Sequence, residues 1–62
     1  MPLIHVNILK GRTTEQKARF ASGVTDAAVD TLGVKREQVR VLIHEIEPEH
    51  WFTAGLPKGA PA

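Results

Sequence analysis

The fold is decided by the stretch PLIHVNIL at residues 2–9 and its counterpart VRVLIHEI at residues 39–46. In the first stretch the residues Ile4, Val6 and Ile8 form one wholly apolar face, and the alternate positions are mixed. A period of two is typical of a half-buried β-strand. The second stretch is rich in β-branched residues and has apolar side chains on both faces. This pattern predicts a strand that is covered on both sides.

The residues between these two stretches carry the signals of one α-helix. Thr13 and Gln16 fit a capping box, and Glu15 adds an acidic charge to the first turn. Apolar residues then recur every three or four positions from Phe20 to Leu32, and Gly33 is suited to end the helix. Two strands joined by a helix form a right-handed crossover with parallel strands. We therefore predict an α/β (α+β) chain, a single βαβ unit with parallel strands and a short C-terminal hairpin or tail.

The length of the chain predicts one small domain over residues 1–62. A chain of this size buries only about 60% of its unfolded surface, so it is marginally stable alone. The sequence has no cysteine, which excludes disulfides and thiolate metal sites. One helix covers one face of the sheet only, and the second face, with Leu42 and Ile46, needs another subunit. We therefore expect a homo-oligomer.

Composition argues against several classes of function. The net charge of +1 is unlike that of a dedicated nucleic-acid binder. No run approaches the roughly 20 apolar residues of a membrane span. Lys10 and Arg12 follow the first apolar stretch instead of preceding it, so no signal peptide is indicated and a reducing cytoplasm is the expected location. The spacing of His5, His44 and His50 matches no compact ligand motif, so we expect no metal.

Pro2 is the first candidate for chemistry. Methionine is readily removed from a chain terminus when the next side chain is small, and Pro2 follows Met1 directly. Removal leaves a secondary amine on a rigid ring. The chain would thus have a base or nucleophile at the head of its first strand.

The order of several short motifs resembles the 4-oxalocrotonate tautomerase family, part of the tautomerase superfamily. The resemblance covers nearly the whole chain up to about Gly55. It is carried by Pro2 at the start of the first strand, Gly11-Arg12 at its end, Thr-x-Glu-Gln-Lys at residues 13–17, Val-Arg-Val at residues 39–41, and His50-Trp51 in the tail.

The resemblance implies a cofactor-independent isomerase that assembles as a hexamer, a trimer of dimers. Pro2 matches the catalytic base, Arg12 an arginine that binds one substrate carboxylate, and Arg40 one that engages the other carboxylate and the carbonyl oxygen. Trp51 and Leu9 match residues that line the pocket. The implied substrates are small unsaturated 2-hydroxy or 2-oxo acids such as 2-hydroxymuconate, in aromatic hydrocarbon catabolism.

The tail departs from the family pattern. Phe52 stands where a glycine is usual, and Pro57 and Pro61 replace the usual ending. We expect the last few residues to be frayed. These differences leave the size of the pocket and the choice of substrate open.

General chemistry is consistent with the role implied for Pro2. A proton shift between oxygen and carbon needs a base whose pKa is near the working pH. The pKa of a terminal amine starts somewhat above neutrality, and an apolar pocket with Arg12 and Arg40 nearby lowers it.

The geometry of the first strand adds a constraint on the site. Residues 2–9 span roughly 23 Å when extended, so Arg12 lies at the far end of the strand from Pro2. Arg40, which opens the parallel second strand, is expected beside Pro2 of its own chain. We therefore predict that a site combining Pro2 and Arg12 exists only in the oligomer.

Two other interpretations remain open at this stage. In the first, Pro2 acts as an acid and a carboxylate among Glu45, Glu47 and Glu49 directs water, giving a hydratase or dehalogenase of haloacrylate-like acids. In the second, the chain is a non-catalytic oligomeric binding module. It would then lose nothing when Pro2 is replaced by alanine.

Overall fold

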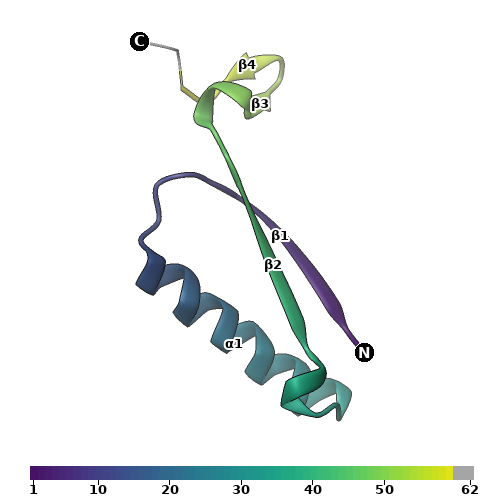
Figure 1. Cartoon of the computed structure of the whole chain (residues 1–62). Helices are drawn as coiled ribbons and strands as arrows, with labels where there is room; N and C mark the ends of the chain where they lie inside the picture. The colour runs from purple at the N-terminus through teal and green to yellow at the C-terminus, as the bar shows by residue number, and fades with distance from the viewer. Residues whose placement is uncertain (60–62) are drawn as a thin grey trace.

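A computed structural model describes residues 1–59 of the chain (Figure 1). Pro61 and the frayed end predicted around it lie outside these residues. Two strands and a helix come first, followed by short segments, where η marks a 3₁₀-helix. The elements are β1 (Leu3–Leu9), α1 (Thr14–Leu32), η1 (Arg36–Gln38), β2 (Arg40–Ile46), η2 (Pro48–His50), β3 (Phe52–Thr53) and β4 (Leu56–Pro57).

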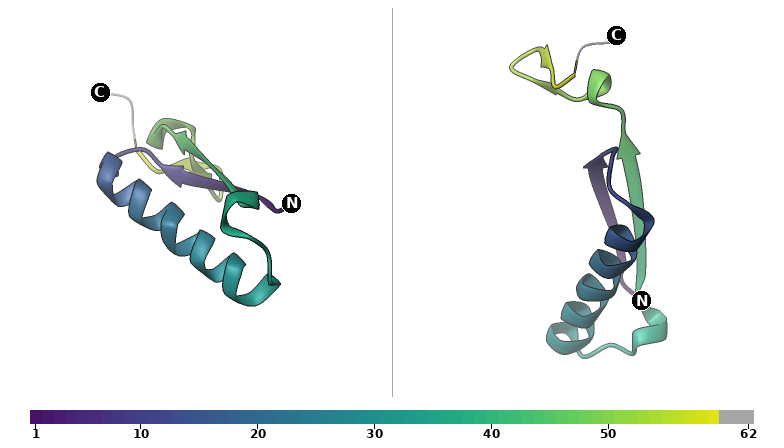
Figure 2. Two further views of the ribbon diagram at one scale, coloured as in Figure 1. Left: turned by 60° about the horizontal axis from the view of Figure 1, so that its bottom comes forward. Right: turned by 90° about the vertical axis from the view of Figure 1, so that its left-hand side faces the viewer.

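The sheet of β1 and β2 is parallel, as the sequence predicts. Leu3 lies opposite Arg40 at one end, and Leu9 lies opposite Ile46 at the other. Because the register has no offset or bulge, residues with the same place in the two strands share a face. Helix α1 packs across one face of this sheet and runs back against the strand direction (Figure 2).

The helix has the ends that its sequence predicts. The Thr13 hydroxyl accepts a hydrogen bond from the Gln16 N–H, and the Gln16 side chain accepts one from the Thr13 N–H, both at 3.0 Å. Gly33 ends the helix with φ +68°, in the left-handed region that glycine adopts at little cost. The capping box and the terminal glycine therefore fix α1 over the sheet.

The two faces of the sheet differ sharply in exposure. Ile4, Val6 and Ile8 are half-buried beneath the helix, whereas Leu3 and Leu42 on the opposite face are exposed. The alternation agrees with the prediction that Leu42 lies on a face that α1 leaves open.

The core of the single chain is very small. Among residues 1–59, Ala28 alone is buried, with 6% of its surface exposed. Phe20 and Leu32 fall on the apolar stripe of the helix, yet they are 47% and 63% exposed. The sequence pattern places both on the face of the helix that packs toward the sheet. A sheet of two strands is too narrow to cover the whole apolar stripe of a 19-residue helix.

The dimensions of the chain confirm that it is not compact. Its accessible surface is 4896 Å², whereas a compact monomer of 6.8 kDa exposes about 4,000 Å². Its radius of gyration is 14.7 Å, against about 11 Å for a compact chain of this length. The excess surface of about 900 Å² is close to what one partner contributes to a standard interface, about 800 Å².

The tail forms a small unit beyond the end of β2. Strands β3 and β4 pair in a hairpin whose turn residues Ala54 and Gly55 have φ of +54° and +80°. Two positive φ values are the geometry of a type I′ turn, which matches the twist of a hairpin. The hairpin lies away from the helix at the far end of the sheet (Figure 2). Within the described residues, no helix is long and apolar enough to span a membrane.

Candidate active site

Pro2 and Arg40 lie together at the end of the sheet where both strands begin. The Arg40 N–H donates a hydrogen bond of 3.0 Å to the Pro2 carbonyl oxygen, which extends the β-ladder by one step. Pro2 is half-buried, while Met1 before it is exposed and makes the Pro2 nitrogen an amide in this structure. The predicted neighbourhood of Pro2 and Arg40 within one chain is therefore present.

The Arg40 side chain is held back against the chain that precedes β2. One of its terminal nitrogens donates to the Glu37 carbonyl oxygen at 2.7 Å and to the Val39 carbonyl oxygen at 3.4 Å. Its other guanidinium nitrogens make no hydrogen bond to residues 1–59 and are free to donate to a ligand. A guanidinium anchored on one edge retains the planar fork that matches a carboxylate.

Leu9, Arg12 and Trp51 lie at the opposite end of the sheet. Leu9 is the last residue of β1, and Arg12 is in the loop that leads from β1 to α1. Trp51 follows η2 and is half-buried, and its carbonyl oxygen accepts a 2.7 Å hydrogen bond from the Lys58 N–H. Lys10 joins the two segments, because its ammonium group lies 3.0 Å from the Glu47 carboxylate.

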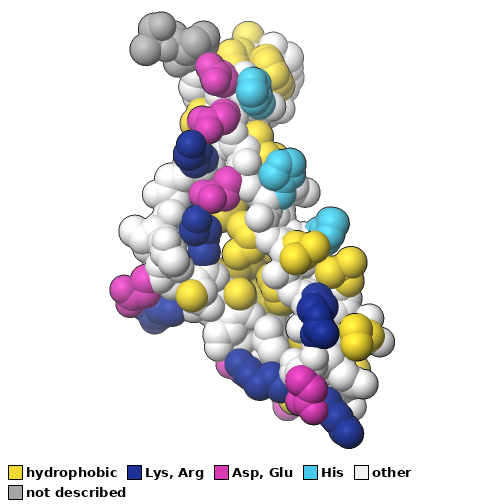
Figure 3. Space-filling view, in the orientation of Figure 1, with side chains coloured by type: hydrophobic (Ala, Val, Ile, Leu, Met, Phe, Trp, Pro, Cys, Tyr) yellow, Lys and Arg dark blue, Asp and Glu magenta, His cyan; other side chains and the backbone are white. Residues whose placement is uncertain are grey.

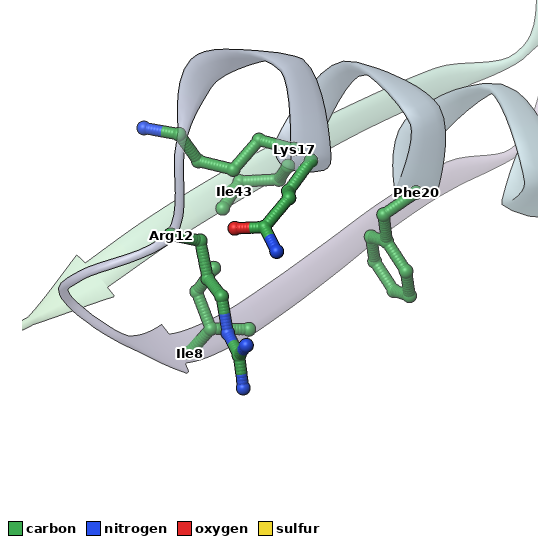
Figure 4. A pocket seen from close by; sticks show the side chains of 6 residues that line it. Ile8, Arg12, Lys17, Phe20 and Ile43 are labelled. Carbon is green, nitrogen blue, oxygen red and sulfur yellow. The ribbon is translucent and has the colours of Figure 1, made fainter.

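A pocket of about 260 Å³ opens beside Arg12 (Figure 4). Its walls are mainly apolar, from Ile8 and Ile43 of the sheet and Phe20 of the helix. The Arg12 guanidinium extends away from the helix, toward the same side as the Phe20 ring (Figure 4). The apolar periodicity of the helix places Phe20 on its apolar stripe and does not indicate that it lies beside Arg12. Phe20 is half-exposed because the two-stranded sheet is too narrow to cover it.

No pocket described in this chain contains both halves of the predicted site. The pocket beside Arg12 includes neither Pro2 nor Arg40, and neither Leu9 nor Trp51 lines it. Seven residue steps of extended strand, roughly 23 Å, separate Pro2 from Leu9. A substrate with two carboxylates a few bonds apart therefore cannot contact Pro2 and Arg12 of the same chain.

The glutamates of the alternative interpretation are mostly engaged in ion pairs. Glu45 faces the helix and lies 3.0 Å from the Lys17 ammonium group. Glu47 is paired with Lys10. Glu49 is exposed in η2, beyond the end of β2. None of the three lies at the end of the sheet that holds Pro2. Among residues 1–59, no group of three or more potential metal ligands comes together.

The sequence of residues 2–60 matches the model of the Tautomerase enzyme family. The chain belongs to this family. A probable tautomerase of Ralstonia nicotianae is 53% identical over 60 residues, which cover 97% of this chain and 86% of that protein. A probable tautomerase of Staphylococcus aureus is 41% identical over 58 residues, covering 94% and 95%.

Solved structures place this member of the tautomerase family near the 4-oxalocrotonate tautomerases. One of the 4-oxalocrotonate tautomerase isozymes from Methylibium petroleiphilum has a TM-score of 0.89 and 46% identity, over 92% of this chain and 89% of that one. A heterohexamer 4-oxalocrotonate tautomerase from Chloroflexus aurantiacus has a TM-score of 0.90 and 38% identity, over 94% of both chains. The resemblance seen in the sequence is confirmed, and the protein is an isomerase of the tautomerase type.

Proposed function

We propose that this tautomerase shifts a proton between oxygen and carbon in small unsaturated 2-hydroxy or 2-oxo dicarboxylic acids, without a cofactor. The observation that carries the proposal is the division of the candidate residues between the two ends of one sheet. Pro2 and Arg40 lie at one end, and Leu9, Arg12 and Trp51 lie at the other. Two ends from different copies together supply a base, two guanidinium groups and an apolar wall.

Pro2 supplies the base once Met1 has been removed. The free secondary amine takes a proton from the substrate hydroxyl group or carbon and returns it at the other end of the conjugated system. A base is most effective when its pKa is near the working pH. The cationic Arg40 guanidinium nearby disfavours a second positive charge on the Pro2 nitrogen, which supports a role as a base.

The two arginines contact different parts of the substrate. Arg40, next to Pro2, stabilises the negative charge that builds on the carbonyl oxygen as the dienolate forms. The planar guanidinium group of Arg12 from another copy binds the distant carboxylate through two parallel hydrogen bonds. Leu9 and Trp51 exclude water beside it, which strengthens both electrostatic interactions.

The proposed site requires an oligomer, and the surface of the chain supports one. An excess of about 900 Å² of exposed surface is sufficient for one standard interface per protomer. The Chloroflexus aurantiacus neighbour is a heterohexamer. By this analogy, and from the resemblance in the sequence, we propose a homohexamer built as three dimers for this chain.

The ion pairs of Glu45 and Glu47 favour proton transfer over hydration or dehalogenation. A carboxylate that directs water must be free to accept a proton from it. Glu45 is paired with Lys17 on the helix side of the sheet, and Glu47 with Lys10. Both carboxylates are therefore engaged with other partners, which leaves Glu49, exposed in η2, as the carboxylate of that alternative without an ion pair among residues 1–59.

The direct test is the conversion of 2-hydroxymuconate, followed by ultraviolet absorbance. The protein used must first be shown by intact mass to lack Met1, because an amide at Pro2 cannot act as a base. We expect conversion well above the rate in buffer, with no added metal or cofactor. A rate equal to that of buffer, in protein of the correct mass, would contradict the proposal.

A matched sample separates the role of the amine from that of the fold. Protein that retains Met1, and that has the same oligomeric mass and circular dichroism spectrum, should be inactive. Equal activity in the two samples would assign the chemistry to a group other than Pro2.

A further inference from the structure

The sheet face opposite the helix, called here the open face, carries histidines in an apolar setting. The zero-offset register of β1 and β2 brings its residues together. Most are exposed, including Leu3 at 60% and Leu42 at 53%. The open face consists of Leu3, His5, Asn7, Leu9, Arg40, Leu42, His44 and Ile46.

His5 and His44 are neighbours on this face, although 38 residues separate them in the chain. His5 lies opposite Leu42, and Asn7 lies opposite His44, so the two imidazoles are diagonal neighbours on adjacent strands. Both line one shallow pocket of about 260 Å³ with Asn7 and Leu42. Histidine side chains follow the strands with hydrophobic side chains beside them (Figure 3).

The open face provides no negative charge to compensate a protonated histidine. On β1 its polar residues are His5 and Asn7, and on β2 they are Arg40 and His44. Arg40, at the Pro2 end of this face, is itself cationic.

The charged groups on the neighbouring elements do not change this balance. Lys17 of α1 and Glu45 of β2 pair with one another on the helix side of the sheet. Beyond the end of β2, Glu47 is paired with Lys10, and Glu49, His50 and Lys58 belong to the tail unit. Protonation of His5 or His44 therefore adds unbalanced positive charge to the open face.

A second copy of this chain is the occupant that the dimensions of the protein favour. The surface exposed in excess, about 900 Å², matches one side of a standard interface. The proposed function also requires copies to meet along the strands, because it unites opposite ends of the sheet from different chains. If symmetric copies meet through this face, the histidines of one copy approach those of another.

The open face is where the sequence predicts another subunit, and we propose that protonation of His5 and His44 separates the copies that meet there. This inference rests on the oligomer of the proposed function and adds a control by pH that the function does not require. An imidazole in water gains its proton around pH 6.5. Neutral imidazoles at pH 8 can be buried with hydrogen bonds, whereas imidazolium ions without a counter-charge strongly oppose burial. Acid therefore separates the copies, and separation takes the shared site apart.

Sedimentation velocity between pH 8 and pH 5, at constant ionic strength and protein concentration, tests the inference. We expect the wild-type protein to be assembled at pH 8 and to dissociate on acidification, with an apparent dissociation constant at least about tenfold higher at pH 5.5 than at pH 7.5. The double variant His5→Gln/His44→Gln should remain assembled over the whole range. Wild-type protein that remains assembled at pH 5, or a double variant that dissociates in parallel with it, would overturn the proposal.

Two further variants make the test specific. His50→Gln changes a histidine in η2, outside the open face, and should dissociate as the wild type does. Leu42→Lys places a permanent charge between the two histidines and should weaken the assembly already at pH 8, with the helix content retained by circular dichroism. Normal assembly of Leu42→Lys at pH 8 would show that the open face is not the interface.

Turnover measured at pH 7.5 on the same samples separates this inference from the proposed function. An assembled wild-type protein without turnover would refute the function and leave the pH control standing. An active protein that stays assembled in acid would refute the pH control alone.

Discussion

The two ends of the β1–β2 sheet present different chemical groups to a substrate. The end where the strands begin has a potential base, Pro2, directly beside a cation, Arg40. The end where they finish has a cation, Arg12, beside a pocket with apolar walls from Ile8, Phe20 and Ile43. Under the proposed function, neither end alone both binds and deprotonates a dicarboxylic acid. The unit of function that we propose is therefore a pair of unlike ends, one from each of two copies.

The largest expected effect comes from the beginning of the sheet. Replacement Pro2→Ala leaves a terminal amine but removes the ring that fixes its direction. Because a positioned general base contributes about 10²–10⁴-fold, kcat should fall by that order. Steady-state kinetics on protein with verified mass and assembly provide the measurement. An unchanged kcat would assign the chemistry to a group other than Pro2.

The arginines at the two ends should differ in the parameter they affect. Arg40→Ala removes charge stabilisation near the reacting oxygen and should lower kcat by about 10²–10³-fold. Arg12→Ala removes a grip on the distant carboxylate and should act mainly on KM. The matched variants Arg40→Lys and Arg12→Lys keep the charge but lose the fork, and should recover part of each loss. Identical changes in kcat and KM for the two alanine variants would contradict different roles for Arg40 and Arg12.

Substitutions in the hairpin at the far end of the sheet should change the free energy of unfolding. Ala54 has a φ of +54°, which disfavours side chains with a Cβ atom. Ala54→Gly should therefore raise the free energy of unfolding by about 0.5–1 kcal/mol, and Gly55→Ala should lower it by a similar amount. Urea unfolding at fixed protein concentration measures both. A loss of stability in Ala54→Gly would show that the turn is not under this strain.

The smallest effect concerns the ion pair that joins the loop after β1 to the segment after β2. The Glu47 carboxylate accepts a hydrogen bond from Lys10 and raises the pKa of Lys10 above its ordinary 10.5. A raised pKa in the folded chain means that the pair stabilises the fold below pH 10.5 and that this contribution is lost as the pH rises further. Because the pair is exposed, the effect on stability is small. Glu47→Gln should lower the pKa of Lys10 in an NMR titration, and an unchanged pKa would show that the pair does not persist in solution.

Local sequence signals were sufficient for most of the fold. The period of two in residues 2–9, the capping box at Thr13 and Gly33 at the helix end each act over a few residues, and each is present in the structure. The single turns η1 and η2 were not predicted, because three residues are too few to produce a periodic pattern. The exposure of Phe20 and Leu32 could not be predicted, because the exposure of a helix face depends on the width of the sheet beneath it.

The candidate site was less accessible to sequence reasoning. Extended-strand geometry alone separated Pro2 from Arg12 and placed Arg40 beside Pro2, and the register agrees. The proximity of His5 and His44 depends on that register, which no spacing along the chain encodes. The roles of Pro2, Arg12, Arg40, Leu9 and Trp51 came from a family resemblance. They remain predictions for kinetics to test.

The most direct test of a site shared between copies is a mixture of two impaired variants, assayed at a substrate concentration well below the KM of the Arg12→Ala variant. Pro2→Ala and Arg12→Ala chains are assayed separately, then unfolded together in equal amounts, refolded and assayed again. If Pro2 and Arg12 of each site come from different chains, about one site in four regains both residues, and the mixture should recover roughly a quarter of wild-type activity. A mixture no more active than the average of its two components would contradict the account, because both residues would then belong to the same chain.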